Sequence, residues 1–147
     1  MTSERIHLTV ATTCVRDGKM LMVQEYENGK LVINQPAGHI EPGETFKGAA
    51  LRETFEETGH KVELEAVLGM SAYPAPNGVT YYRISFLANC PEQSPSSDLD
   101  PEIESIAWMT PEEITAADNH RSHLVQMDVE RYLSGQRFPL EMIRESS

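Results

Sequence analysis

Three glutamates in the first half of the chain stand close enough together to bind a metal ion. Glu53, Glu56 and Glu57 fall within residues 45–58, a predicted helix that ends at Gly59, a residue able to take positive φ. At about 100° per residue, Glu56 and Glu57 lie within about 60° of Glu53, so the three carboxylates share one helix face. Like charges this close repel, and a divalent cation would reverse that interaction. Mg²⁺ suits such a site best, because it takes oxygen ligands and is commonly completed by substrate phosphates, and Mn²⁺ is the expected substitute.

A wider frame of fixed residues surrounds these glutamates. With Gly38, Glu44, Arg52 and Gly59 the frame has seven members. At average usages of about 5 to 7% each, such a set would coincide at a given start on the order of once in 10⁸ to 10⁹. The ordinary interpretation of an acidic helix face, a solvated surface, is therefore disfavoured. Leu51 and Phe55 lie roughly 160° from Glu53 and are expected to face the core.

The frame resembles the Nudix box, G-x5-E-x7-R-E-U-x-E-E-x-G-U, where U is a bulky apolar residue. All seven fixed positions match, whereas Thr54 and His60 occupy the two U positions. The resemblance implies an α/β (α+β) fold, an α/β/α sandwich with a mixed sheet and a helix that carries the metal-binding carboxylates. It also implies an Mg²⁺-dependent hydrolase in which a metal-activated water attacks phosphorus, and an ion pair between Arg52 and Glu44 that positions the helix.

The box residues receive their expected roles from this resemblance. The catalytic residues are Glu57, Glu53, Arg52 and Glu44, and the metal ligands are Glu53, Glu56, Glu57, Gly38 and Glu104. The general base is Glu57 or Glu53, with Glu57 favoured. Glu104, four residues before Trp108, is the first candidate for a ligand from the last strand, and Glu102 is the second. Asp98 and Asp100 are expected to be solvated.

Substrate phosphates need hydrogen-bond donors, and a base or pyrimidine ring needs a stacking partner. The expected substrate-binding residues are Asn34, Gln35, Arg83, Arg121 and Tyr73. A guanidinium binds phosphate oxygens bidentately, and Tyr73 or Tyr81 can stack on a ring. For each of these residues the alternative is an ordinary polar strand or surface position.

Similarity to one branch of the family extends beyond the box. Residues 34–41 (NQPAGHIE), 121–125 and 134–143 (SGQRFPLEMI) resemble a bacterial phosphatase of the family. This implies release of orthophosphate from nucleoside tri- and diphosphates and from thiamine-pathway pyrimidine diphosphates, namely thiamine diphosphate and hydroxymethylpyrimidine diphosphate. An ADP-ribose or other sugar-nucleotide pyrophosphatase is the alternative, which Pro74 and Pro76 favour. A non-catalytic metabolite sensor is the second alternative, disfavoured because no box carboxylate is missing.

The remaining pattern predicts the elements that position these residues. Strands are expected over residues 6–15, 19–25, 31–35, 62–68, 81–90 and 103–109, with a turn at Asp17 and Gly18. Thr110 and Pro111 open a short helix, a last helix runs over about 123–133, and part of the tail is expected to pack back. Residues 71–78 and 91–101 read as exposed loops. This irregular alternation fits a mixed sheet between helices.

Length and charge limit the number of domains and the kinds of partner that this protein can have. The 147 residues fit one domain, 1–147. A net charge of -11 opposes binding to nucleic acid polymers, while small phosphorylated substrates remain possible. No apolar run approaches a membrane span of about 20 residues, and the N-terminus does not read as a secretory signal, so no membrane partner and a cytoplasmic location are expected. A monomer is expected, with a dimer left open. Cys14 and Cys90 should pack as small hydrophobic residues.

Overall fold

A computed structural model describes residues 5–91 and 95–146. The strands are β1 (Ile6–Arg16), β2 (Lys19–Glu27), β3 (Lys30–Asn34), β4 (Ala37–His39), β5 (Glu63–Pro74), β6 (Thr80–Asn89) and β7 (Ile103–Met109). The helices are α1 (Phe46–Thr58), α2 (Pro111–Ala116) and α3 (His123–Ser134), with a 3₁₀ turn, η2 (Leu140–Met142), near the end. The strands and helices thus follow the predicted order, with β4 as an additional short strand.

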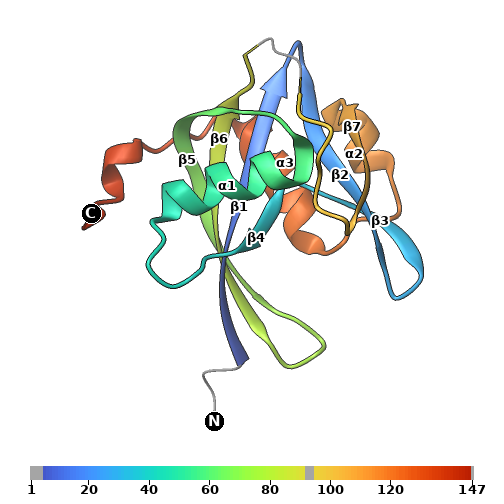
Figure 1. The fold of residues 1–147 in the computed structure, drawn as a ribbon, viewed down its shortest axis with the longest axis horizontal. Helices are drawn as coiled ribbons and strands as arrows, with labels where there is room; N and C mark the ends of the chain where they lie inside the picture. Colours follow the sequence, from blue (N-terminus) through green and yellow to red (C-terminus); the bar gives the residue numbers. More distant parts are fainter. Residues whose placement is uncertain (1–4, 92–94, 147) are drawn as a thin grey trace.

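The sheet is mixed and divides around one hairpin (Figure 1). Its main path runs β3-β2-β1-β6-β5, in which β1 and β6 are parallel and the other neighbours antiparallel. The β1–β2 hairpin turns at Asp17 and Gly18, both with positive φ, and its strands pair only from Val15↔Met20 to Arg16↔Lys19. Beyond these pairs the strands separate, and β4 joins β1 while β7 joins β2.

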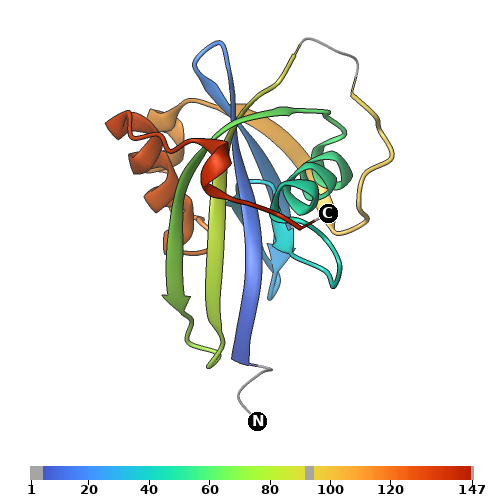
Figure 2. The same cartoon turned by 90° about the vertical axis from the view of Figure 1, so that its left-hand side faces the viewer.

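Helices cover both faces of the sheet, as Figure 2 shows with α1 on one side and α3 on the other. Small and apolar side chains form the layer under α1, namely Val10, Ala49, Ala50, Val67 and Phe86. A second buried cluster joins β2 and β3 to α2 and α3, namely Met20, Met22, Ile33, Ile114, Val125 and Val129. The predicted α/β/α sandwich with a mixed sheet is confirmed.

Two details of the predicted elements are wrong. Leu51 and Phe55 do not face the core, because their exposed fractions are 41% and 38%. The buried residues of α1 are Ala49, Ala50, Thr54 and Thr58. Such short side chains let the helix lie close to the strands, so its core face is the side that also carries Glu53. Part of the predicted 71–78 loop is also strand, since β5 pairs with β6 as far as Pro74↔Thr80.

The tail packs back against the sheet, as predicted. The amide and carbonyl groups of Phe138 pair with those of Val67 at 2.9 and 2.8 Å. Leu140 and Ile143 then pack against the cluster under α1, where the tail lies beside the start of that helix (Figure 2). None of the helices in the described ranges is long and apolar enough to cross a membrane.

Candidate metal and substrate site

Helix α1 has a defined start and end. The Thr45 hydroxyl accepts a hydrogen bond from the Gly48 amide at 2.9 Å, which caps the N-terminus. At the other end Gly59 takes φ 76°, and its amide donates to the Phe55 carbonyl at 2.8 Å. A Cβ at residue 59 would lie 2.0 Å from the Ser96 carbonyl oxygen, so space as well as φ requires glycine. The glutamates between these caps therefore have a fixed register.

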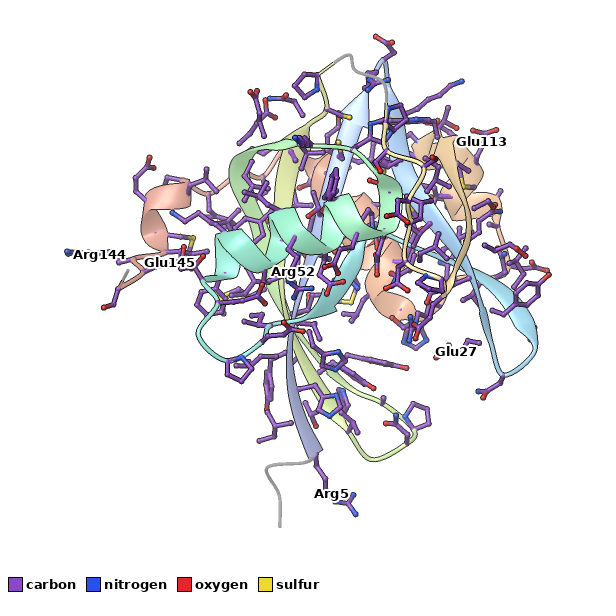
Figure 3. All side chains as sticks on the ribbon, in the orientation of Figure 1. Arg5, Glu27, Arg52, Glu113, Arg144 and Glu145 are labelled. Carbon is purple, nitrogen blue, oxygen red and sulfur yellow. The ribbon has the colours of Figure 1, made fainter. Side chains whose placement is uncertain are left out.

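Arg52 of α1, labelled in Figure 3, contacts three acidic side chains and one backbone carbonyl. Its Nε and Nη2 lie 2.6 and 2.8 Å from the two carboxylate oxygens of Glu44, a bidentate pair. Its Nη1 donates to Glu53 at 2.8 Å and to Glu56 at 3.1 Å, and its Nη2 donates to the His39 carbonyl at 3.2 Å. The ion pair between Arg52 and Glu44 is confirmed, and it ties the loop before α1 to the helix.

Gly38 gives the Glu53 carboxylate its space. A Cβ built on Gly38 would lie 2.2 Å from both Cδ and Oε2 of Glu53, so a side chain at this position would force the Glu53 carboxylate to move. Strand β4 brings Gly38 to this position by pairing it with Val10 of β1. The backbone of β4 and the carboxylate of α1 are therefore in direct contact, and this contact explains why the frame begins with glycine.

Glu57 lies deepest among the helix carboxylates. Its Oε1 accepts a hydrogen bond from the Ala37 amide at 3.0 Å. Burial raises the pKa of Glu57 to about 9, the Ala37 amide opposes that shift, and the charges of Glu53, Glu25 and Asp100 raise the pKa further. Burial likewise raises the pKa of Glu53. Carboxylates from α1, from β2 and from the loop before β7 thus influence one another electrostatically.

Three of the expected substrate contacts lie inside the fold. Asn34, Gln35 and Arg83 have exposed fractions of 7%, 1% and 4%. The Arg83 Nη2 donates to Gln35 Oε1 at 2.9 Å and lies 3.1 Å from Asp128 Oδ2, which also accepts from the Ser85 hydroxyl at 2.7 Å. Arg83 and Gln35 therefore belong to a buried network between the sheet and α3, and in this arrangement a phosphate cannot reach Arg83.

Arg121 and Tyr73 line a pocket instead. The pocket has a volume of about 540 Å³, and its lining also includes His120, Ser122, His123 and Met127. The Arg121 guanidinium lies 2.8 Å from Glu25 and 3.4 Å from Glu27, and its side chain remains 42% exposed. Arg121 thus joins the pocket wall to Glu25 of β2, whose charge contributes to the raised pKa of Glu57.

A row of five rings runs from β4 to the N-terminus of α3. His39 and His7 contact edge to face at 4.8 Å between centroids, and His7 contacts Tyr81 at 5.3 Å. Tyr81 stacks on Tyr73 at 6.4 Å, and Tyr73 lies 5.9 Å from His123 at the pocket. Flat groups therefore extend from the residue after Gly38 to the pocket wall.

Comparison with known proteins decides the family of this site. The family model of the NUDIX domain matches residues 5–127. The chain belongs to the Nudix family. Phosphatase NudJ of Escherichia coli K12 is 42% identical over 137 residues, which cover 93% of this chain and 90% of the relative. NudJ of Shigella flexneri matches to the same extent.

Comparison with solved structures supports the same family assignment. A NUDIX hydrolase from Nitrosomonas europaea has a TM-score of 0.90 and 38% identity, covering 95% of this chain and 97% of that one. A MutT NUDIX hydrolase from Burkholderia pseudomallei has a TM-score of 0.74 at 20% identity, covering 87% of this chain and 98% of that one, which shows likeness of fold alone. The chain is therefore a Nudix hydrolase, an enzyme of a family that uses divalent cations.

The Nudix carboxylates fit such a cation by their chemistry, since all donors are hard oxygens. In residues 5–91 and 95–146, no three His, Cys, Asp or Glu side chains are arranged to hold an ion as they stand. The reason is visible in their present partners: Arg52 holds Glu53 and Glu56, and the Ala37 amide holds Glu57.

Two acidic residues near the Nudix helix were missed by sequence reasoning. Glu25 of β2 is only 9% exposed, and burial raises its pKa. Asp100 is partly buried rather than solvated, and its amide donates to the Glu56 carbonyl at 2.8 Å. Glu102 and Glu104 are exposed, and the role of Glu104 as a ligand stays a prediction. Glu25 alternates along β2 with the buried residues Leu21 and Val23, and this spacing could have predicted that its side chain faces inward. The loop sequence around Asp100 contains no comparable signal.

Proposed function

We propose that this Nudix hydrolase is an Mg²⁺-dependent phosphatase of small diphosphates. Its substrates would be nucleoside tri- and diphosphates and the thiamine-pathway pyrimidine diphosphates, thiamine diphosphate and hydroxymethylpyrimidine diphosphate, with release of orthophosphate. One observation carries the proposal: the Arg52-clamped carboxylates of α1 are linked through Glu25 and Arg121 to a ring-lined pocket. Identity of 42% to Phosphatase NudJ supports the phosphatase reaction.

The metal would be held by Glu53, Glu56 and Glu57, with the Gly38 carbonyl and an acidic residue near β7 as further ligands. When bound, Mg²⁺ supplies a lowered pKa for a water molecule and charge neutralisation for phosphate oxygens. Mn²⁺ offers the same oxygen preference and would substitute. Burial is the main cause of the raised pKa values of Glu53 and Glu57, and a cation would offset the repulsion between neighbouring carboxylates that adds to it.

The chain's own groups would then orient the attack on phosphorus. Glu57 is the proposed base, because the Ala37 amide fixes one of its oxygens and burial favours proton uptake by its carboxylate. Glu53 is the alternative base. Arg52 and Glu44 act through the helix as positioning residues, since their bidentate pair fixes the loop and helix together.

The pocket would hold the organic part of the substrate. Its volume, about 540 Å³, lies within the range of roughly 300 to 1,000 Å³ usual for small-molecule sites. Tyr73 would stack on a base or pyrimidine ring, and Arg121 would bind a phosphate oxygen in exchange for part of its contact with Glu25. Gln35 and Arg83 would support this wall from inside the fold, beside Asn34.

A product-resolved assay tests the proposal. GTP, GDP, thiamine diphosphate and ADP-ribose are each incubated with the protein and Mg²⁺, and orthophosphate is measured with and without added alkaline phosphatase. We expect direct orthophosphate from the first three, and none after Glu57→Gln. Signal that needs added phosphatase and comes only from ADP-ribose would replace the proposal by a sugar-nucleotide pyrophosphatase. No turnover of any substrate would favour a metabolite sensor.

Assembly and location are part of the same proposal. We expect a cytoplasmic monomer, in keeping with small phosphorylated substrates. Size-exclusion chromatography with light scattering at two protein concentrations would test the assembly state. A mass of twice 16.5 kDa at both concentrations would establish the dimer instead.

A further inference from the structure

We propose that Cys90 is a reactive thiol, which hydroperoxides and small soft electrophiles modify in the folded protein. It lies just after β6, beside the residue that follows the C-terminal cap of α1. Its Sγ accepts a hydrogen bond from Arg16 Nη2 at 3.1 Å and lies 3.3 Å from His60 Nδ1. A sulfur between a cation and an imidazole differs from a thiol packed only among hydrocarbons, and it has the surroundings of a nucleophile.

Arg16 is held against this sulfur by three other contacts. Its Nε donates to the Cys90 carbonyl at 3.1 Å, and its Nη2 donates to the Pro91 carbonyl at 3.3 Å. The guanidinium carbon lies 4.8 Å from the centroid of the Trp108 ring. A guanidinium fixed on three sides keeps its charge beside the sulfur without further ordering during the attack.

His60 provides a place for the thiol proton. It is 3% exposed and packs edge to face on Trp108 at 5.7 Å. Burial and the charge of Arg16 lower the pKa of His60, which is therefore neutral at neutral pH and can accept a proton at Nδ1. The box pattern places a bulky apolar residue here, and this chain has an imidazole that faces a thiol instead.

The reaction with a hydroperoxide then balances within this cluster. The Cys90 sulfur attacks one peroxide oxygen, an S–O bond forms and the O–O bond breaks. His60 takes the thiol proton and passes it to the departing oxygen, which leaves as water from hydrogen peroxide or as an alcohol from an organic hydroperoxide. Cys90 becomes a sulfenic acid, two electrons are transferred to the peroxide, and His60 returns to its neutral form.

The second cysteine, Cys14, provides an internal comparison for the reactivity of Cys90. It is fully buried, whereas Cys90 keeps 5% exposure next to the exposed Pro91. Burial and the neighbouring Cys90 raise the pKa of the Cys14 thiol, so Cys14 stays protonated. Both cysteines are free. Both cysteines pack in one apolar cluster, as expected, and the contacts of Cys90 with Arg16 and His60 add a polar side to its site.

The test treats the full-length folded protein with hydrogen peroxide and dimedone and locates the adducts by peptide mass mapping. We expect Cys90 to react at least about tenfold faster than Cys14, and both to react alike in urea. Arg16→Met keeps the cover over the sulfur but removes its charge, and should slow the reaction about tenfold, whereas Arg16→Lys should keep most of it. Equal native rates for the two cysteines would overturn the proposal.

If circular dichroism shows that Arg16→Met does not fold, a second variant still tests the proposal. His60→Gln keeps a polar side chain of similar size but cannot accept and return a proton as imidazole does, so Cys90 oxidation should slow. Cys14→Ser is the control for the assignment of the adducts, because every remaining adduct should then map to Cys90. A rate at Cys90 that neither the Arg16 substitutions nor His60→Gln alters would also refute the assigned roles.

Discussion

Replacing Glu57 by Gln should stabilise the metal-free protein while abolishing hydrolysis. Folding places this carboxylate where burial raises its pKa from 4.5 to about 9. Below pH 4.5 both the folded and the unfolded chain carry the proton, and there is no penalty. As the pH rises above 4.5 the unfolded chain ionises first, so the free energy of unfolding falls, and the loss is complete once the pH exceeds the folded pKa.

The magnitude follows from the same shift. At pH 7 the unfolded carboxyl is 2.5 units above its pKa of 4.5 while folded Glu57 stays protonated, which corresponds to about 3 kcal/mol at 1.36 kcal/mol per unit. Residual hydration reduces this figure, so we expect a gain of about 1 to 3 kcal/mol for Glu57→Gln. The side-chain amide oxygen that this substitution introduces can still accept the hydrogen bond from Ala37, so that contact is kept.

Urea denaturation in EDTA between pH 4.5 and 8 measures the effect. The two proteins should be equally stable near pH 4.5, and the variant should be increasingly more stable as the pH rises. Adding Mg²⁺ should stabilise the wild type more than the variant, since a ligand that binds only the folded state adds stability. Glu56→Gln is the matched control, because it makes the same substitution on the same helix at a side chain that is 47% exposed.

The reasoning would fail if Glu57→Gln were no more stable than the wild type in EDTA at pH 7. It would also fail if the difference between the two proteins did not change with pH. Either result would mean that the Glu57 carboxylate is hydrated or paired in the metal-free protein, and its role as a buried ligand and base would have to be abandoned.

Three further substitutions separate the parts of the site. Gly38→Ala should lower kcat/KM about 10²-fold and weaken Mg²⁺ activation, because its Cβ would displace the Glu53 carboxylate; normal kinetics would contradict this. Arg83→Met should destabilise the fold by about 3 kcal/mol in urea denaturation, since it leaves Asp128 without its closest cation; a change below about 0.5 kcal/mol would refute the network. Arg121→Ala should change stability by less than about 1 kcal/mol but raise KM several-fold, and an unchanged KM would remove it from the substrate site.

Local sequence patterns predicted the structure correctly wherever the interacting groups are close in sequence. The helix with Glu53, Glu56 and Glu57, its Thr45 and Gly59 ends and the Asp17 turn are all set by residues within one or two turns of chain. The Arg52 pair with Glu44 came from family resemblance, because helix geometry alone does not make these two residues neighbours. The mixed sheet followed from the order of the elements together with that resemblance.

Predictions failed where a side chain's surroundings come from another element. Leu51 and Phe55 are the bulkiest apolar residues of the middle of α1, yet Ala49 and Ala50 form its core face, because strands β1 and β4 lie close to the helix and leave room only for small groups. Arg83 looked like a phosphate clamp, but Asp128 of α3 meets it inside the fold. The sequence around Arg83 does not indicate that a carboxylate from a distant helix will pair with it.

The sequence by itself determined the family and the helix that carries Glu53, Glu56 and Glu57, because helix periodicity fixes which carboxylates share a face. Only the tertiary structure decided which other groups join them. Separation of β1 and β2 admits β4 and β7, so that Gly38 meets Glu53 and Glu25 comes within electrostatic reach of Glu57. These contacts depend on how strands from distant parts of the chain pair with one another. The register of such a pair is set by both strands together, so the sequence of one strand does not specify it.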